Sequence, residues 1–410
     1  MQKIVIIGAG ASGLMTAICS KTKYNEVLLL ERNSEVGKKI LATGNGRCNY
    51  WNADQSLTNY HSTNKELLSK IITENACQEV QNIFTKLGII PKIKSGYYYP
   101  SSNQATSIRN ALLTECLEKG VIIKTNCHVT NVKKEKDVFL IDTETETIKS
   151  DVLVIATGAK ASHKTGSDGN GYLLAKKFNH TIINPLPALV QLKTTGDFLK
   201  NWAGVRTDVK VFSREDNNII GVEEGEIQLT DYGVSGICIF NLSSHIARGL
   251  SQNKKEELII NFLPFIEGSA KEWLEARETY ITKTTISKQL ETILNYKLVQ
   301  VILKLSKINP NTYYEDLTSL EKTTLVKNLT NFTITVTGTN SFDNAQVTSG
   351  GIPLTEVNIE TMESKLTKNL YFSGEILDVD GKCGGYNLGF AWLTGLIIGR
   401  SIGDKNVKNS

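Results

Sequence analysis

Short apolar runs alternate with longer amphipathic segments along the first 160 residues of the chain. The opening predicts a strand over Lys3–Ile7, a glycine turn over Gly8–Gly13, a helix from about Ser12 to Lys21 and a strand over Glu26–Leu30. These pieces occupy about 30 residues, which is the length of one βαβ unit. We therefore expect the chain to begin in a parallel sheet.

The same alternation continues beyond the first unit. Helical patterns follow over Lys65–Leu87 and Gln104–Lys119, and apolar runs predict strands over Val121–Lys124, Val138–Ile141 and Val152–Ile155. Strands that alternate with helices assemble most naturally into a doubly wound, Rossmann-like α/β sheet. The final segment returns to this pattern, with a strand at Asn369–Ser373 and a helix from about Asn387.

The middle of the chain has a different pattern. Short β-branched segments separated by turn residues predict a small antiparallel sheet or barrel, with strands at Ala188–Leu192, Val209–Ser213, Ile219–Val222, Glu226–Leu229 and Phe332–Val336. Apolar positions from Leu290 to Leu305 recur at the spacing of one helix face, and helices are also expected at Lys271–Tyr280 and Leu317–Leu329. We predict a nucleotide-binding domain from both chain ends (1–187 and 345–410), a β-rich domain (188–250 and 331–344) and a helical insert (251–330).

Composition excludes some classes of protein. The 410 residues are 40% hydrophobic and 21% charged, which is typical of a globular chain rather than a disordered one. The net charge of +4 is weak, so no nucleic-acid partner is expected. The apolar stretches 4–20 and 383–399 fit buried elements, the first being interrupted by glycines, and no membrane partner is expected.

Cysteine and histidine usage points to a reducing compartment. Seven scattered cysteines include no CxxC pair, and the five histidines are not paired at metal-ligand spacing. Zinc, iron–sulfur and dithiol sites need short spacings, so we expect no metal and a cytoplasmic location.

The strongest local motif is Gly8-x-Gly10-x-x-Gly13 between the first strand and helix. Gly8 allows a tight turn, Gly10 leaves room for a pyrophosphate, and Gly13 lets the helix pack on the strand. Glu31, at the end of the second strand, is placed to accept hydrogen bonds from the hydroxyl groups of a ribose. The sequence thus predicts one tightly bound dinucleotide, with any second nucleotide bound elsewhere or transiently.

A polar loop follows the first βαβ unit and runs from Lys38 to Asn49. Its glycines allow the backbone to wrap a polar ligand, and Arg47 could hold a phosphate or a flavin carbonyl. Cys48 could be a redox thiol, but no second cysteine lies within 28 residues of it, so a small packed residue is the favoured interpretation.

Together these residues resemble one bacterial family. The resemblance rests on the Gly8–Gly13 motif with Glu31, on 42–49, and on Ala156-Thr157-Gly158. It also rests on Thr348-Ser349-Gly350-Gly351, Thr361-Met362-Glu363-Ser364-Lys365 and the run from Leu370 to Leu388. The chain resembles the BaiN/RdsA-type NAD(P)/FAD-dependent oxidoreductases, also called the YhiN or aminoacetone oxidase family. It departs at 230–237, where many members have a Thr-His pair followed by Gly-x-Ser-Gly-Pro.

This resemblance implies non-covalent FAD held by both chain ends. The implied cofactor residues are Gly8, Gly10, Ala11, Ser12, Gly13, Glu31, Arg32, Lys38, Lys39, Thr43, Gly44, Asn45, Gly46, Arg47, Cys48, Asn49, Val129, Ala156, Thr157, Gly158, Gly374, Glu375, Asp380, Gly384, Gly385, Tyr386 and Asn387. A helix N-terminus beginning near Tyr386 would stabilise negative charge on a reduced flavin. Tyr386 and Cys48 are the candidates for catalysis, and neither is settled by the sequence.

Four functions remain open from sequence. The first is transfer of hydride between NAD(P)H, flavin and a small organic substrate such as an enone or a ketone. The second is oxidation of a small amine or ketone with peroxide as product. An RNA-modifying flavoprotein is the third, and a nucleotide sensor without turnover is the fourth. The sequence does not indicate the oligomeric state.

Overall fold

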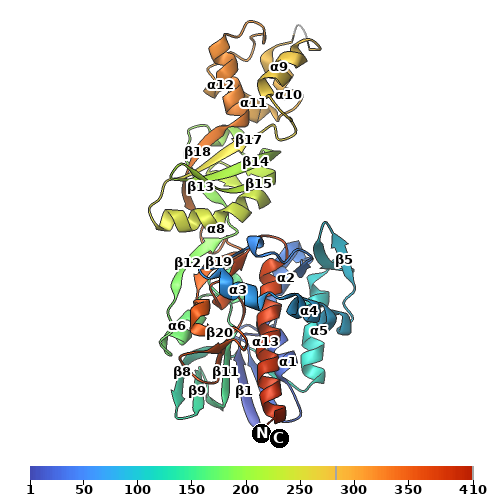
Figure 1. The fold of residues 1–410 in the computed structure, drawn as a ribbon, viewed down its shortest axis with the longest axis vertical. Helices are drawn as coiled ribbons and strands as arrows, with labels where there is room; N and C mark the ends of the chain where they lie inside the picture. Colours follow the sequence, from blue (N-terminus) through green and yellow to red (C-terminus); the bar gives the residue numbers. More distant parts are fainter. Residues whose placement is uncertain (282–283, 409–410) are drawn as a thin grey trace. The chain divides into compact units, whose positions relative to one another are not determined.

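The computed structural model describes residues 1–281 and 284–408, which divide into two compact units. Unit 1 consists of Met1–Leu186 and Gln346–Ser410, and unit 2 of Pro187–Ala345. Figure 1 shows the course of the chain through both units. The further division of unit 2 into a β-rich domain and a helical insert stays a prediction.

Unit 1 is built on a seven-stranded sheet, which confirms the Rossmann-like α/β fold. Its strand order is β20 (Val357–Asn358), β21 (Glu363–Ser364), β22 (Leu370–Phe372), β11 (Val152–Ile155), β1 (Gln2–Ile7), β2 (Asn25–Leu30) and β7 (Ile122–Lys124). From β22 to β7 all pairs are parallel, and the pairs at β21 are antiparallel. A strand from residue 370 onward thus pairs beside strands of the N-terminal half.

Helices cover the sheet and bring the two chain ends together. Helix α1 (Ala11–Ser20) packs along α13 (Tyr386–Lys408) and also contacts α5 (Ala105–Glu118). In Figure 1 helices α1 and α13 lie side by side. Small residues permit this contact, since a Cβ on Gly395 would approach the carbonyl oxygen of Ser12 to 2.7 Å.

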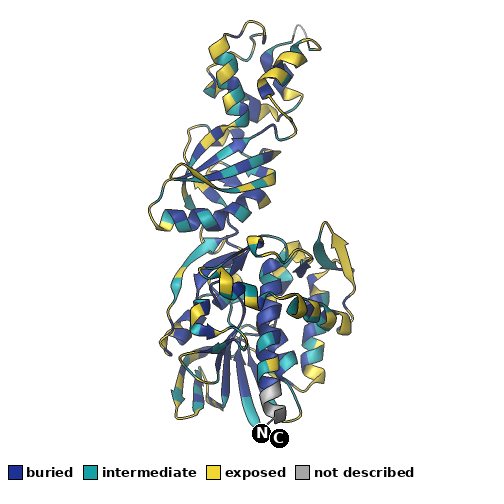
Figure 2. Cartoon of the chain, in the orientation of Figure 1, coloured by how far each residue is buried: buried dark blue, intermediate teal, exposed yellow. Residues whose placement is uncertain are grey.

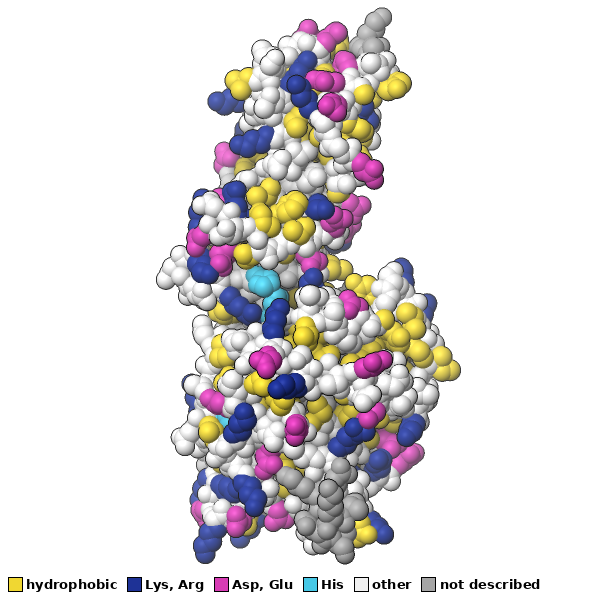
Figure 3. Space-filling view, in the orientation of Figure 1, with side chains coloured by type: hydrophobic (Ala, Val, Ile, Leu, Met, Phe, Trp, Pro, Cys, Tyr) yellow, Lys and Arg dark blue, Asp and Glu magenta, His cyan; other side chains and the backbone are white. Residues whose placement is uncertain are grey.

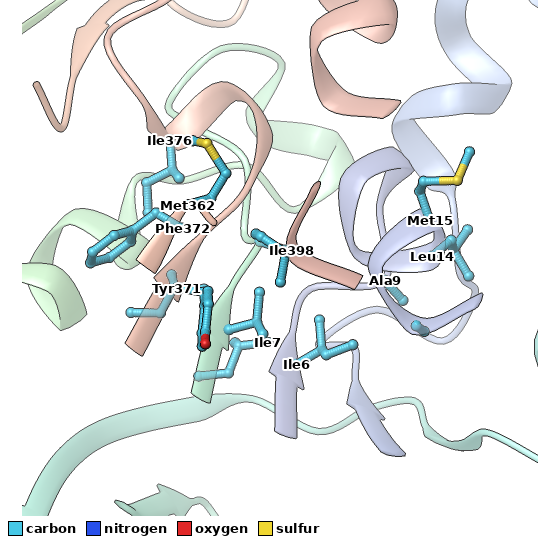
Figure 4. Packing of buried hydrophobic residues seen from close by; sticks show 14 of the residues in the cluster. Ile6, Ile7, Ala9, Leu14, Met15, Met362, Tyr371, Phe372, Ile376 and Ile398 are labelled. Carbon is cyan, nitrogen blue, oxygen red and sulfur yellow. The ribbon is translucent and has the colours of Figure 1, made fainter. Parts of the chain in front are cut away.

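The hydrophobic core of unit 1 takes residues from distant parts of the chain. Figure 4 shows Ile6 and Ile7 of β1 packed near Tyr371 of β22 and Ile398 of α13. All four residues are buried. Strand β1 reads as a nearly continuous apolar run because both faces of the sheet are covered.

Two three-stranded sheets, one strand pair, four helices and a 3-10 turn complete the parts of unit 1 near the site. The first sheet is antiparallel and consists of β8 (Val129–Glu135), β9 (Val138–Thr143) and β10 (Thr147–Ser150), and the second has the order β3 (Trp51–Asn52), β6 (Tyr97–Pro100) and β5 (Pro91–Lys94). The strand pair is β4 (Tyr60–His61) with β23 (Asp380–Gly381). The helices are α2 (Lys38–Ala42), α3 (Lys65–Ile71), α4 (Glu74–Lys86) and α6 (Asn170–Lys176), and the 3-10 turn is Thr43–Gly46. The helical pattern expected over Lys65–Leu87 is confirmed and is divided between α3 and α4, because Thr73 accepts a hydrogen bond from the Ala76 N–H and starts a new helix.

Unit 2 contains a closed six-stranded barrel. Its order is β13 (Leu192–Thr194), β16 (Gly233–Ser235), β15 (Asn218–Leu229), β14 (Arg206–Glu215), β17 (Glu256–Asn261) and β18 (Phe332–Thr339). The strand expected over Ala188–Leu192 is wrong: β12 (Ile183–Ala188) ends at Ala188, β13 begins only at Leu192, and Leu189 between them takes a left-handed φ of 48°. Strand β17 was not foreseen and lies where helix was expected.

The helices of unit 2 share one hydrophobic core with the barrel. They are α7 (Leu199–Trp202), α8 (Ile237–Ser251), α9 (Ala270–Glu278), α10 (Ile286–Glu291), α11 (Tyr296–Leu305) and α12 (Ser319–Thr330). The apolar face from Leu290 to Leu305 belongs to two helices, since Asn295 accepts a hydrogen bond from the Lys297 N–H and begins α11. Helix α8 was missed by the sequence pattern.

Candidate cofactor and active site

The glycine turn between β1 and α1 has the geometry of a phosphate-binding turn. Gly8 has a φ of +102°, and a Cβ there would lie 2.5 Å from the carbonyl oxygen of Ala156. A Cβ on Gly13 would lie 1.9 Å from the carbonyl oxygen of Gly8, whereas one on Gly10 would meet nothing within 4 Å. Gly8 and Gly13 therefore permit close backbone packing, and Gly10 faces open space where a ligand can approach.

Helix α1 begins without a side-chain cap. Its N-cap residue is Gly10, and the first residues of the helix are Ala11 and Ser12. Uncapped N–H groups in the first turn and the positive end of the helix dipole favour an anion. This arrangement fits the pyrophosphate of a dinucleotide.

Glu31 is fixed at the end of β2 by three hydrogen bonds. Its Oε2 accepts from the Ala9 N–H at 2.9 Å, and its Oε1 accepts from the N–H and the side-chain amide of Asn33 at 2.8 and 2.7 Å. The carboxylate is 7% exposed. The glycine turn and the acid at the next strand are thus one rigid assembly, and Oε2, which accepts one hydrogen bond, retains a lone pair for a ribose hydroxyl.

Arg32, which follows Glu31 in the chain, and Val129 each contact the segment 168–170. Arg32 forms an ion pair with Asp168, and the carbonyl oxygen of Val129 accepts a hydrogen bond from the Asn170 side chain at 3.0 Å. Burial raises the pKa of Asp168, but its hydrogen bonds and the charge of Arg32 outweigh burial and hold the pKa below its usual value. The ion pair with Asp168 therefore fixes the orientation of the Arg32 side chain.

The two chain ends meet at the mouth of this turn. The Ser12 hydroxyl donates to the carbonyl oxygen of Ser373 at 3.2 Å. Gly374 has a φ of +78°, and a Cβ there would lie 2.6 Å from the Ser12 Oγ. The predicted convergence of the N-terminal turn with the segment around residue 374 is confirmed.

Lys39 and Glu375 form an ion pair between these two segments. Their Nζ and Oε2 atoms are 2.6 Å apart, with the side chains 26% and 16% exposed. The other oxygen of Glu375 accepts from the Thr348 N–H at 2.9 Å. A Cβ on Gly158 would lie 4.0 Å from Glu375 Oε2, so the Ala156-Thr157-Gly158 segment also reaches this place. Lys38 is exposed.

Thr348 lies at this site, although the sequence did not indicate it as a cofactor-binding residue. Its hydroxyl oxygen accepts from the N–H groups of Lys160 and Ala161 at 3.0 and 2.9 Å. It therefore fixes the chain after Gly158 while its own N–H fixes Glu375. The only sequence signal was its place in the Thr348-Ser349-Gly350-Gly351 run.

The loop over residues 43–49 is a tight turn rather than an extended wrap. Gly44, Asn45 and Cys48 have φ values of 57°, 53° and 58°. Residues 44–47 are exposed, and Asn49, in the amide orientation that satisfies its hydrogen bonds, donates to the carbonyl oxygens of Tyr98 and Trp51. The Thr43 hydroxyl donates to the Ile40 carbonyl oxygen at 2.6 Å, so this end of the loop is anchored on α2.

Cys48 is a buried thiol. It is 0% exposed, and burial raises its pKa to about 12. A thiol with so high a pKa stays protonated near neutral pH and is a poor nucleophile. We therefore do not propose Cys48 as a redox group.

The loop before α13 packs on the polar loop. A Cβ on Gly385 would lie 2.6 Å from the backbone of Trp51, and the Asn52 side chain donates to the Gly384 carbonyl oxygen at 2.9 Å. Asn387 fastens the loop by accepting from the Gly381 N–H and donating to its carbonyl oxygen, both at 2.8 Å. The two motif-rich runs, 42–49 and 380–387, therefore form one surface.

Tyr386 sits in an aromatic cluster at the start of α13. Its ring contacts Tyr60 edge to face, with centroids 5.5 Å apart and an interplanar angle of 82°. Tyr386 is 7% exposed. Asp380 pairs with His61 in the neighbouring strands β23 and β4. Tyr386 thus lies among the proposed cofactor residues, and its catalytic role stays a prediction.

The Thr361–Lys365 run supports the sheet rather than lining the site. Ser364 accepts from the N–H groups of Leu366 and Thr367 and lies 2.7 Å from His180 Nε2. His180 Nδ1 lies 2.8 Å from Glu356, and burial lowers the His180 pKa. This buried group ties β21 to the chain after α6, and no sequence signal paired its members.

The fold and site define a Rossmann-type flavoprotein oxidoreductase. The chain belongs to the family described as HI0933-like protein Rossmann domain, whose model matches residues 2–401. It is 38% identical to the 3-dehydro-bile acid delta(4,6)-reductase of Clostridium scindens, over 99% of this chain and 100% of that protein. It is 28% identical to the ribosomal RNA dihydrouridine synthase of Escherichia coli, over 95% of this chain and 94% of that protein.

A solved structure shares the fold. The structure of 3-ketosteroid delta1-dehydrogenase from Sterolibacterium denitrificans aligns with a TM-score of 0.52 at 10% identity, over 99% of this chain and 100% of that chain. Within residues 1–281 and 284–408, none of the helices combines the length and the apolar character that crossing a membrane would require.

Proposed function

We propose that this protein is an FAD-dependent reductase of a carbon–carbon double bond conjugated to a carbonyl group. The observation that carries the proposal is the pair of near full-length relatives, at 38% and 28% identity. The name of the first denotes reduction of a bile acid with a 3-keto group, and the name of the second denotes addition of two hydrogens to uridine. Both substrates contain a double bond next to a carbonyl carbon, so one reaction covers both names.

The cofactor-holding roles follow from the geometry of unit 1. The first turn of α1 would bind the pyrophosphate, Glu31 the ribose, and the Gly374–Glu375 segment with Lys39 the chain between ribose and flavin. When bound, FAD supplies the hydride chemistry. The start of α13 would stabilise negative charge beside it.

The remaining roles belong to the substrate. Hydride addition to the β-carbon of an enone needs a proton at the α-carbon, and the Tyr386 hydroxyl is our candidate for the proton source. NAD(P)H is the proposed transient electron donor. All seven cysteines are free thiols, as is usual for proteins of a reducing compartment, and this supports our proposal of a cytoplasmic location.

Anaerobic titration tests the proposal. The purified flavoprotein is mixed with NADH or NADPH under argon while the flavin absorbance is followed, and a conjugated enone such as a Δ4-3-keto steroid is then added. We expect bleaching by one nicotinamide and recovery of the absorbance on addition of the enone. Peroxide formation from an amine or ketone without NAD(P)H would instead support the oxidase.

A further inference from the structure

A buried histidine joins three segments of unit 1 outside the proposed cofactor residues. His180 follows α6, and its side chain is 0% exposed. Its Nδ1 lies 2.8 Å from Glu356 Oε2, directly before β20, and its Nε2 lies 2.7 Å from Ser364 Oγ on β21. We call His180, Glu356 and Ser364 the His180 group.

The hydrogen bonds of the His180 group determine where its protons lie. Ser364 Oγ accepts hydrogen bonds from the N–H groups of Leu366 and Thr367 at 3.0 and 2.9 Å. A hydroxyl oxygen has two lone pairs, so Ser364 can meet Nε2 only by donating its own hydrogen to it. The ring proton must then be on Nδ1, which donates it to Glu356. Every polar atom of the group is satisfied while the histidine is neutral.

A second proton on the His180 ring would break this arrangement. It would place an Nε2–H against an oxygen whose two lone pairs are already used, and the Ser364 hydroxyl hydrogen would lose its acceptor. Burial lowers the pKa of His180, and the hydrogen bond and negative charge of Glu356 oppose burial without outweighing it.

Within the described part of the chain, Glu356 is the charged group that acts on the His180 ring. Ser364 of β21 and Phe372 of β22 face the ring and carry no charge. Figure 3 shows cationic and acidic side chains mixed over one face of the molecule, where water screens them. The charged residues nearest in sequence to the group bind other atoms or are exposed, namely Lys176, Lys177, Glu363 and Lys365.

The His180 group supports the strand that ends at the proposed cofactor site. The ring contacts Phe372 edge to face, with centroids 4.6 Å apart and an interplanar angle of 75°. Phe372 is the last residue of β22 and is followed by Ser373, which accepts the hydrogen bond of Ser12, and by Gly374. Figure 2 shows the central strands of this sheet as buried, and a close-packed interior transmits a shift of one residue to the next.

Helix α6 gives a second connection to the same place. A Cβ on Gly171, in its first turn, would lie 2.0 Å from Thr157 Oγ1 and 2.9 Å from a side-chain carbon of Ile376. The start of α6 therefore packs on the Ala156-Thr157-Gly158 segment and on the residue after Glu375. The chain beyond its other end is fixed by His180.

We propose that His180 is a positioning residue for the cofactor: the neutral ring keeps the end of β22 and helix α6 in the geometry that binds FAD, and protonation of the ring disrupts it. The inference rests on the proposed function, because FAD is the group that the Gly374–Glu375 segment would bind. A proton on His180 and FAD then compete. The pKa of His180 in the folded protein lies below its ordinary value of about 6.5, so FAD affinity is full above that pH and falls as the pH drops below it.

Flavin release as a function of pH tests the proposal. The purified full-length flavoprotein is diluted at pH values from 5.5 to 8.0, and the flavin fluorescence at equilibrium gives the Kd for FAD. We expect this Kd to rise by about tenfold between pH 7.5 and 5.5 in the parent and to change by less than about twofold in His180→Gln, since glutamine does not titrate. His163→Gln, which changes an exposed histidine of the same unit, should keep the pH dependence of the parent.

Two variants of the neighbours separate proton binding from a merely structural role. Glu356→Gln removes the negative charge that favours the protonated ring, so the pH midpoint of the loss of affinity should move down. Ser364→Ala removes the hydroxyl that donates to Nε2, which leaves this nitrogen free to take a proton, so the midpoint should move up. A residue that only fills space would not give shifts of opposite sign.

A spectroscopic measurement keeps the proposal testable if His180→Gln does not fold. In NMR spectra of the parent labelled with ¹⁵N-histidine at pH 7.5, His180 should carry a proton on Nδ1 and none on Nε2. A doubly protonated ring at this pH, equal pH dependence of the Kd in His180→Gln and the parent, or midpoint shifts of the same sign in Glu356→Gln and Ser364→Ala would overturn the proposal.

Failure of this inference is distinguishable from failure of the proposed function. A Kd for FAD that does not depend on pH, in a protein that reduces an enone, would refute the positioning role alone. The expected pH dependence of the Kd, in a protein that reduces no enone, would refute the proposed function and keep the positioning role.

Discussion

The Ser12 hydroxyl donates a hydrogen bond to the carbonyl oxygen of Ser373, a residue 361 positions further along the chain. This bond joins the first turn of α1 to the strand end that precedes Gly374. Because the segments come from opposite chain ends, the site forms only when the C-terminal part has docked on the N-terminal sheet. Binding of a cofactor there would stabilise the docked state by mass action.

Gly374→Ala should disturb this junction. The added Cβ would lie 2.6 Å from Ser12 Oγ, and a φ of +78° is strained for alanine. We expect a loss of about 1–3 kcal/mol in the free energy of unfolding and a lower flavin content. Thermal unfolding and the ratio of flavin to protein absorbance measure both. Gly338→Ala is the control, since its Cβ would meet only a lysine carbon at 4.0 Å. Wild-type flavin content in Gly374→Ala would contradict the assignment.

Glu31→Gln should weaken cofactor binding. The carboxylate accepts from the Ala9 N–H and twice from Asn33, and a glutamine NH2 group would face one of those donors instead. Loss of a charge-assisted acceptor costs about 1.5–3 kcal/mol, so the Kd for FAD should rise about tenfold or more. Isothermal titration of the apoprotein measures it. Glu26→Gln, on the same strand but 42% exposed at its side chain, should bind FAD normally.

Lys39→Ala should act on the cofactor through Glu375. Removing the ammonium leaves the Glu375 carboxylate, whose side chain is only 16% exposed, with a hydrogen bond from the Thr348 N–H but without its cation. We expect a severalfold loss of FAD affinity, and a much smaller further loss when Glu375→Gln is added, because the unpaired charge is then gone. Additive losses would show that the two residues act independently. Lys3→Ala, which removes an exposed surface pair, should have no effect on FAD.

Cys48→Ala should retain activity. The thiol is buried and protonated, so its removal costs packing and no chemistry. We expect kcat within about threefold of the parent and a loss of about 1 kcal/mol in stability. Alkylation at pH 7.5 followed by mass spectrometry should leave Cys48 unmodified in the native protein and modify it after unfolding. A large loss of kcat at wild-type stability would restore the redox hypothesis.

The glycine turn and Glu31 could be predicted from the sequence, because both depend on short spacings along the chain. The docking of the C-terminal segment could be predicted from the family resemblance. Contacts between distant residues were not predictable. Lys39 and Glu375 are 336 positions apart, and Ser364 meets His180 across 184 positions, so no local pattern pairs them. Helix α8 was missed because it follows several β-branched segments and lies between barrel strands, where tertiary packing overrides the local pattern.

The barrel contains a carboxyl pair that should make stability depend on pH. Glu256 is opposite Glu215 across β17 and β14, is 1% exposed, and its two oxygens have no hydrogen-bond donor within the described part of the chain. Burial raises the pKa of Glu256 most, and the negative charges of Glu215 and Asp216 raise it further. Lys254 has a smaller, opposing effect, and the resulting pKa of Glu256 is about 8.

The direction of the pH effect follows from proton binding. Between the ordinary glutamate pKa and about 8, the folded state holds a proton on Glu256 that the unfolded state releases, so stability falls as pH rises through this range. Melting temperatures of Glu256→Gln should fall less between pH 5.5 and 8.5 than those of the parent. Glu257→Gln is the contrast, because Lys255 and Arg214 outweigh burial and lower the Glu257 pKa. Identical pH profiles for Glu256→Gln and the parent would show that Glu256 is ionised in the folded barrel.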